Sequence, residues 1–164
     1  MLTVRLSKLV MVVGLALFAL LVALDNVADY GSNEAFVRHV LAMDTTFPQN
    51  ALRWRAITDP ELQTVAYWLI IAAEMLTGVL FGVAALVMVT RLRAPKAEFR
   101  VAASWVAAGA AMAFTLWFVG FMVVGGEWFL MWQSSTWNGQ EAAFRFYLTV
   151  LAVSAFVLLD TGEG

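Results

Sequence analysis

The chain has 164 residues, a net charge of −2 and no cysteine, and 62% of its residues are hydrophobic. Its mean hydropathy is +0.80, and a water-soluble domain with this composition would expose large apolar patches. The small net charge does not indicate a nucleic-acid partner or an acidic substrate. The absence of cysteine excludes disulfides, thiolate metal sites and thiol catalysis, and the single histidine, His39, excludes a haem held by two histidines of one chain.

Four apolar stretches are each long enough to cross the hydrocarbon core of a bilayer as a helix, which needs about 20 residues. The sequence therefore predicts an all-α membrane fold. We expect one integral membrane domain over residues 1–164, folded as a four-transmembrane-helix bundle with amphipathic helical segments in its outer loops. The expected spans are residues 6–24, 64–90, 101–124 and 141–159.

The first span follows Arg5 and Lys8, an arrangement that a secretory signal peptide shares. The apolar run ends at Asp25 without the small residues of a cleavage site. We therefore interpret this span as an uncleaved anchor.

Two polar segments, 25–63 and 127–140, separate the spans and are predicted to carry short helices. Asn33 is expected to cap an amphipathic helix over residues 36–41, and Pro48 is expected to open a second short helix. Such amphipathic helices lie on the membrane surface or fold over the mouth of the bundle.

Two helix starts carry clear signals. Asp59 is placed as an N-cap with Pro60 at the first helical position, which predicts the start of the second span. Asn138 and Glu141 have the spacing of a capping box ahead of the fourth span.

The distribution of basic residues predicts the orientation. Six of the ten lysine and arginine residues lie near the N-terminus or in the 91–100 loop, namely Arg5, Lys8, Arg91, Arg93, Lys96 and Arg100. This places both termini in the cytoplasm and both long loops outside. Five tryptophans agree with this orientation because they fall at or near the outer interface: Trp54, Trp68, Trp128, Trp132 and Trp137.

Glu74 is the strongest functional indication, because it lies inside the apolar run 64–89. A carboxylate near mid-membrane is costly unless it is protonated, paired or hydrated, and it marks a site by default. Gly78 and Gly82 follow at four and eight residues and allow another helix to approach closely, so Glu74 is expected to face protein. The third span offers a matching small face, made of Ala103, Ala107 and Ala111.

Arg145, about one turn into the fourth span, is the expected partner of Glu74. Glu127 and Asp25, at the outer ends of the third and first spans, join this candidate polar site or compete for it. The pair has two interpretations: an ion pair that fixes helix register, or a site for a transported proton, ion or substrate. We favour the ion pair, the commoner case.

Other groups give weaker indications. Three tryptophans are candidate interface or ligand contacts, with membrane anchoring as the expected role: Trp128, Trp132 and Trp137. His39 lacks a second histidine or cysteine to share a metal ion. Asp44 with Thr45 and Thr46 fits a cation site or a turn held by side-chain bonds, and the turn is favoured. We predict no catalytic residue, no metal site and no cofactor.

Several motifs carry a resemblance over nearly the whole chain. They are DYGSN at 29–33, FVRHV at 36–40, MDTTFP at 43–48, WRAIT at 54–58, WFVGFMVVGGEWF at 117–129, MWQS at 131–134 and WNGQ at 137–140. These stretches resemble a bacterial family of predicted small integral membrane proteins, domain-of-unknown-function family 2165. The resemblance implies a bacterial inner (cytoplasmic) membrane location and a four-span layout, and it transfers no catalytic residue.

Two functions fit the sequence. The first is a non-enzymatic accessory, assembly or structural subunit, alone or beside a larger membrane complex. The second is a small transporter, or a membrane protein that binds a lipid or quinone, centred on Glu74 and Arg145. The lack of catalytic motifs, the small helix faces and the long outer loops favour the first.

Overall fold

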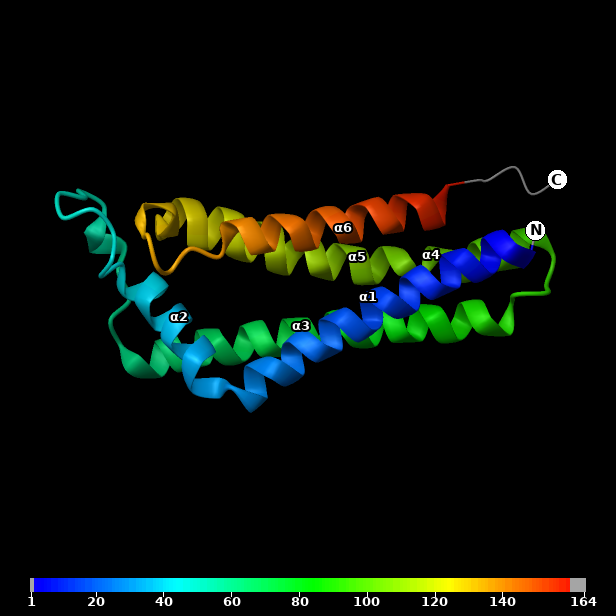
Figure 1. Ribbon diagram of the computed structural model, residues 1–164, viewed down its shortest axis with the longest axis horizontal. Helices are drawn as coiled ribbons and strands as arrows, with labels where there is room; N and C mark the ends of the chain where they lie inside the picture. Colours follow the sequence, from blue (N-terminus) through cyan, green and yellow to red (C-terminus); the bar gives the residue numbers. More distant parts are fainter. Residues whose placement is uncertain (1, 160–164) are drawn as a thin grey trace.

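The computed structural model describes residues 2–159, and its regular structure within that range is helical throughout (Figure 1). Four of these helices are long and apolar enough to cross a membrane: Leu2–Ala28, Pro60–Thr90, Lys96–Trp128 and Gln140–Leu158. The prediction of an all-α fold with four spans is confirmed. The first and third spans extend beyond their expected ends, because the helices continue past the apolar residues that a bilayer requires. The second helix begins at Pro60, as its cap predicts, and ends at Thr90 as expected.

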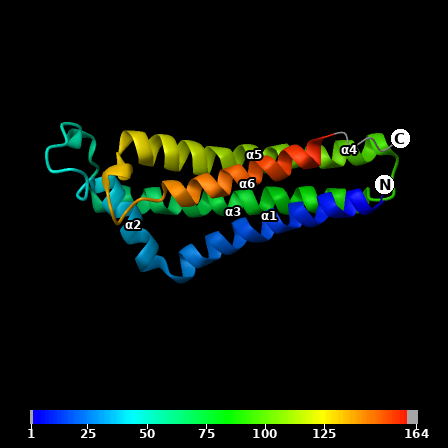
Figure 2. The same ribbon diagram turned by 45° about the horizontal axis from the view of Figure 1, so that its top comes forward.

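The long helices carry shorter elements between them. In chain order they are α1 (Leu2–Ala28), α2 (Tyr30–Ala42), the 3₁₀ turn η1 (Arg53–Arg55), α3 (Pro60–Thr90), α4 (Lys96–Ser104), α5 (Val106–Phe114), the π-helix η2 (Thr115–Trp128), the 3₁₀ turn η3 (Met131–Gln133) and α6 (Gln140–Leu158). The third span is thus built from α4, α5 and η2. Figure 2 shows α1 alongside α3, and α2 turning sharply away from the end of α1.

The bundle has two different ends. One end, here the loop end, carries α2, the first loop segment (residues 43–59) and the second loop segment (residues 129–139) (Figure 1). The other, here the basic end, carries the start of α1 and the connection between α3 and α4 at residues 91–95.

The largest helix interface joins α1 to α3. A Cβ atom added at Gly78 would lie 2.6 Å from Cγ of Leu20, so this glycine permits the close approach of α1. Gly82 has no atom within 4 Å of such a Cβ. The helix at Gly78 is therefore α1 and not the third span.

The small face expected on the third span is also corrected. Ala103 is buried, whereas Ala107 and Ala111 are exposed, and Gly109 packs against the ring of Phe81 in α3. The reason is geometric: at 3.6 residues per turn, every step of four residues rotates a side chain by about 40° away from the starting face. The same drift carries Gly82 away from the face of Glu74.

The expected helix starts meet different outcomes. Asp59 caps α3 as predicted, with its Oδ1 accepting from the amides of Glu61 at 2.9 Å and Leu62 at 3.1 Å. The cap at Asn33 was wrong: α2 begins at Tyr30, only two residues after α1 ends, so the chain is already helical there.

The two remaining expectations are met only in part. The helix expected after Pro48 is the single 3₁₀ turn Arg53–Arg55. At α6, Asn138 Oδ1 accepts from the amide of Gln140 at 3.1 Å, but Glu141 pairs with Arg145 and so does not complete a capping box.

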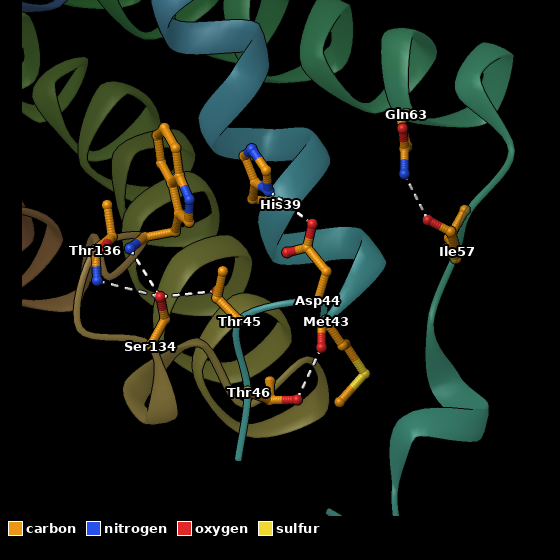
Figure 3. A network of polar contacts seen from close by, with 10 residues as sticks. His39, Met43, Asp44, Thr45, Thr46, Ile57, Gln63, Ser134 and Thr136 are labelled. Carbon is orange, nitrogen blue, oxygen red and sulfur yellow. Dashed lines mark hydrogen bonds and ion pairs between the residues drawn. The ribbon is translucent and has the colours of Figure 1, made fainter. Parts of the chain in front are cut away.

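The two loop segments are bonded to each other at the loop end. Ser134 Oγ accepts from Thr45 Oγ1 at 2.9 Å and from the amides of Thr136 and Trp137 at 3.3 and 2.9 Å (Figure 3). Gln133 Oε1 accepts from the amide of Phe47 at 3.1 Å. A second hydrophobic cluster lies beneath these bonds and joins α2, α3 and the second loop segment.

Candidate functional site

Glu74 lies in the middle of α3 and is only 2% exposed. Its Oε2 accepts a hydrogen bond of 2.7 Å from Nδ2 of Asn26 in α1. Among the described residues, Glu74 makes no ion pair and its Oε1 has no hydrogen-bond partner. The carboxyl is therefore buried with one amide as its polar neighbour.

Tyr67 holds this amide in place. It lies seven residues before Glu74 on the same face of α3, is 1% exposed, and donates its hydroxyl to the carbonyl oxygen of Asn26 at 2.6 Å. Tyr30 packs edge-on against its ring, with the centroids 5.0 Å apart. Tyr67 and Asn26 thus form a short bonded chain that ends at the carboxyl of Glu74.

The sequence reasoning missed both Asn26 and Tyr67, although a signal for Asn26 was present. The first span was expected to end at residue 24, but α1 continues to Ala28. The buried residues Ala16, Ala19 and Ala23 recur at steps of three and four, and one further step of three reaches Asn26. Extending this buried stripe would have placed an amide on the face that meets α3.

Arg145 is not the partner of Glu74. Its side chain is 65% exposed, and its Nη1 bonds to Glu141 Oε1 at 3.3 Å within the same helix. Ala143, two residues earlier, is buried, and two residues correspond to about 200° around a helix. Arg145 therefore lies on the exposed face of α6.

Glu127 and Asp25 do not join the buried site either. Glu127 is exposed near the end of η2, and Asp25 is exposed on α1. The candidate polar site of four residues is thus reduced to Glu74, with Asn26 and Tyr67 as the groups that accompany it.

Each of the three tryptophans of the second half contacts different residues of the first half. The guanidinium of Arg55 lies 4.5 Å from the ring centre of Trp128, and the rings of Phe47 and Trp132 meet edge-on at 5.8 Å. The ring of Trp137 stacks on His39 at 4.6 Å. They do not converge on one ligand position.

His39 is partnered by a side chain of the following turn. Its Nδ1 lies 2.7 Å from Oδ2 of Asp44 (Figure 3). Thr46 donates its hydroxyl to the carbonyl oxygen of Met43 at 2.8 Å, in the turn that Figure 3 shows beside this pair. Across residues 2–159, no group of three histidine, aspartate or glutamate side chains could hold a metal ion.

Glu74 lines a cavity of about 170 Å³, here the acid cavity. Its other polar walls are Asn26, Asn33 and Tyr67. Its aromatic walls come from α2, η2 and α6: Phe36, Trp117, Phe121 and Phe146.

A second cavity of about 330 Å³, here the apolar cavity, lies between α2, α3 and η2. It is lined by hydrophobic residues and two glycines and has no charged wall. Four residues line both cavities: Phe36, Val37, Ile70 and Phe121.

The π-helix shapes both cavities. The amide of Phe129 bonds to the carbonyl of Val124, a step of five residues. π-helices are rare, are usually limited to one turn, and occur frequently at functional sites. Here the π-helix spans 14 residues and supplies Trp117 to the acid cavity, Gly120 to the apolar cavity, and Phe121 to both.

The comparisons with known proteins give a family and no relative of known function. No curated protein and no solved structure matches the chain. The family described as predicted small integral membrane protein (DUF2165) matches residues 4–160. Because this match covers nearly the whole sequence, the chain belongs to the DUF2165 family of small integral membrane proteins.

Proposed function

We propose that this protein is a non-enzymatic membrane protein that binds a small ligand in the acid cavity. The observation that carries the proposal is the buried carboxyl of Glu74, which lines a cavity of about 170 Å³ and, among residues 2–159, has only Asn26 as a hydrogen-bond partner. A carboxyl has two oxygens that can each accept hydrogen bonds, and here one of them accepts none from the described residues. A carboxyl with an oxygen left over beside a cavity supports a role in binding.

The same observation weakens the purely structural interpretation of Glu74. An acid that fixes helix register needs a partner whose removal would leave it unpaired, and Arg145 is bonded elsewhere. A polar group inside a membrane protein that has no such partner is a site by default.

The loop end also bears on the choice between a ligand-binding protein and an accessory subunit. The long loop segments, which the sequence offered as surfaces for a partner protein, bond to each other through Ser134 and Gln133. Their polar groups are thus partly used within the protein, and this arrangement supports a bundle with an internal ligand over an accessory subunit.

A direct test is to identify what the protein carries. Protein extracted from its own membranes would be examined by native mass spectrometry, together with Ala142→Phe, which fills the acid cavity from α6. The matched control is Ala152→Phe on the exposed face of the same helix.

We expect a bound small molecule in the wild-type protein and in Ala152→Phe, and its loss in Ala142→Phe. Equal loading of all three proteins would contradict the proposal. The proposal would also be contradicted if the wild-type protein is purified without a bound molecule and its tryptophan emission does not change on addition of the total lipid and metabolite extract of the same cells.

We also infer that the basic end faces the cytoplasm of a bacterial cell and the loop end faces the periplasm. The support is the positive-inside rule, applied to Arg5, Lys8 and the 91–100 connection. Because the chain has no cysteine, single cysteines at Arg93 and Thr136 can be labelled with a membrane-impermeant maleimide in intact cells. We expect labelling at residue 136 alone. Labelling at residue 93 alone would show that the orientation is the opposite of the one inferred.

A further inference from the structure

We propose that the ligand of the acid cavity is an amphiphilic organic ammonium ion, with its cationic group beside Glu74 and its apolar substituent in the apolar cavity. This inference rests on the proposed function and names the chemical class of the ligand. It is carried by the charge of the walls, the direction of their hydrogen bonds, the aromatic rings and the volumes.

The walls of the acid cavity favour a positive charge. Among the described residues that line it, Glu74 is the one ionisable acid or base apart from the phenol of Tyr67, and none is a lysine, arginine or histidine. A phosphate, sulfate or carboxylate would therefore meet a carboxyl and no compensating cation. An organic cation would meet the carboxyl that it needs.

The hydrogen bonds of the walls also favour a positively charged or hydrogen-bond-donating ligand. The amide of Asn26 donates to Glu74, the amide of Asn33 donates to the carbonyl of Asp29, and the hydroxyl of Tyr67 donates to the carbonyl of Asn26. Each of these bonds uses one of the two N–H groups of an asparagine amide, or the single O–H group of Tyr67. Oε1 of Glu74 is an acceptor without a partner in the described structure. A ligand that donates or carries positive charge satisfies this oxygen, which a quinone, whose oxygens only accept, cannot do.

Aromatic rings complete a site for a cation. The rings of Trp117 and Phe146 lie 5.5 Å apart and nearly perpendicular, and those of Phe36 and Phe121 stack at 6.3 Å. Cations are attracted to the faces of aromatic rings, and quaternary ammonium groups are recognised by cages of such rings. The four rings named here all line the acid cavity. An inorganic divalent ion would instead need about six oxygen ligands, and no group of three acidic or histidine side chains exists in residues 2–159.

The volumes fit a head and a substituent. An engineered cavity of about 150 Å³ holds benzene, so the acid cavity, at about 170 Å³, has room for a group the size of trimethylammonium. The apolar cavity, at about 330 Å³, shares the walls Phe36 and Phe121 and offers hydrocarbon surface to a chain attached to that group.

The test uses the full chain in phospholipid nanodiscs and follows tryptophan emission and calorimetric heat. The probes are hexyltrimethylammonium, tetramethylammonium, hexyl sulfate and 1-heptanol, each measured against nanodiscs without protein. We expect hexyltrimethylammonium to bind at least about tenfold more tightly than each of the other three, because it alone has both the charge for the carboxyl and rings and the apolar chain.

Three variants assign the binding to its groups. Glu74→Gln keeps the shape of the side chain and an acceptor oxygen. It is expected to weaken the binding of hexyltrimethylammonium by about tenfold or more and to leave the binding of 1-heptanol unchanged. Glu74→Asp keeps the charge and should preserve the preference for the cation. Ala142→Phe should abolish binding of all probes, and Ala152→Phe should leave it intact.

The outcomes separate this inference from the proposed function. If hexyl sulfate or 1-heptanol binds as tightly as the cation and Ala142→Phe removes both, the cavity binds ligands but the ammonium class is wrong. If no probe binds while a co-purified molecule is still lost in Ala142→Phe, the ammonium class is again wrong. If binding is indifferent to Ala142→Phe, both the inference and the proposed function fail.

Discussion

The basic end of the bundle and the acid cavity in its interior treat a buried charge in opposite ways. At the basic end Arg5 is only 5% exposed, its Nη1 donates to the carbonyl oxygens of Leu92 at 3.0 Å and Ala94 at 2.6 Å, and its guanidinium lies 4.8 Å from the ring centre of Phe99. Lys8, also 5% exposed, donates to the carbonyl of Leu159 at 2.8 Å. These cations satisfy carbonyls at helix ends, where cations are favoured.

In the middle of α3, beside the acid cavity, the buried charge-bearing group is Glu74, and its described surroundings are sparse. It receives one hydrogen bond, from Asn26, and borders a cavity. The contrast gives a criterion for reading such groups. A buried ionisable side chain that bonds to carbonyls of a helix end and lines no ligand-sized cavity holds the fold together, and one with an unpartnered atom beside a cavity is available to a ligand.

Replacing Arg5 is expected to have the largest effect on stability. Arg5→Gln removes charge-assisted bonds to two carbonyl oxygens and should lower the free energy of unfolding by about 3 kcal/mol or more. Thermal unfolding in detergent, followed by tryptophan emission, would measure it. The control is Arg93→Gln, which changes an exposed residue of the same end. Equal losses of stability in the two variants would show that the buried position of Arg5 does not make it structural.

Gly78 tests the α1–α3 interface that connects the two ends. Gly78→Val would place atoms against Leu20 of α1 and should cost about 2 kcal/mol, the usual range for overpacking. Gly82→Val, four residues on, meets open space and should be close to neutral. The same unfolding measurement applies, and a larger loss in Gly82→Val would show that the packing has been assigned to the wrong glycine.

Ser134 tests how firmly the loop end is closed. Ser134→Ala removes an oxygen that accepts three hydrogen bonds and should cost about 1 to 2 kcal/mol. Limited proteolysis should cut the 43–59 segment sooner in this variant than in Ser135→Ala, whose side chain is exposed. Identical cleavage rates would mean that the two loop segments are held by their apolar contacts alone.

Glu74→Gln should have the smallest effect on unfolding, below about 1 kcal/mol, because an amide oxygen can still accept from Asn26. The loss should appear in ligand binding. A drop in stability as large as that of Arg5→Gln would show that the carboxyl of Glu74 is structural and that it does not differ from Arg5 in its role.

The four spans and the start of α3 were predictable because they depend on local composition. Four apolar runs of sufficient length and the cap at Asp59 are visible in the sequence, and both appear in the structure. Arg5 and Lys8 were also recognised, but only as a count of positive charges. Their burial follows from helical phase, since both lie on the face of α1 that continues through Val12 and Ala16.

The candidate site was only half predictable. The apolar surroundings of Glu74 single it out, but its partner depends on which faces of four helices meet. Arg145 was chosen by depth along the axis, and rotation about the axis places it on the exposed side of α6. The cavities could not have been predicted, because the periodicity of the third span gave no sign of the π-helix.

The π-helix also limits how the chain can change in length. Removing one residue, for example Gly120, would turn everything downstream by one residue's step around the helix, which is about 100° in an α-helix and smaller in a π-helix. Phe121, now in the wall of both cavities, would rotate toward the lipid acyl chains. A residue that now faces lipid would rotate into the interior of the bundle. Insertions and deletions in this stretch should therefore be far more harmful than substitutions at the same positions.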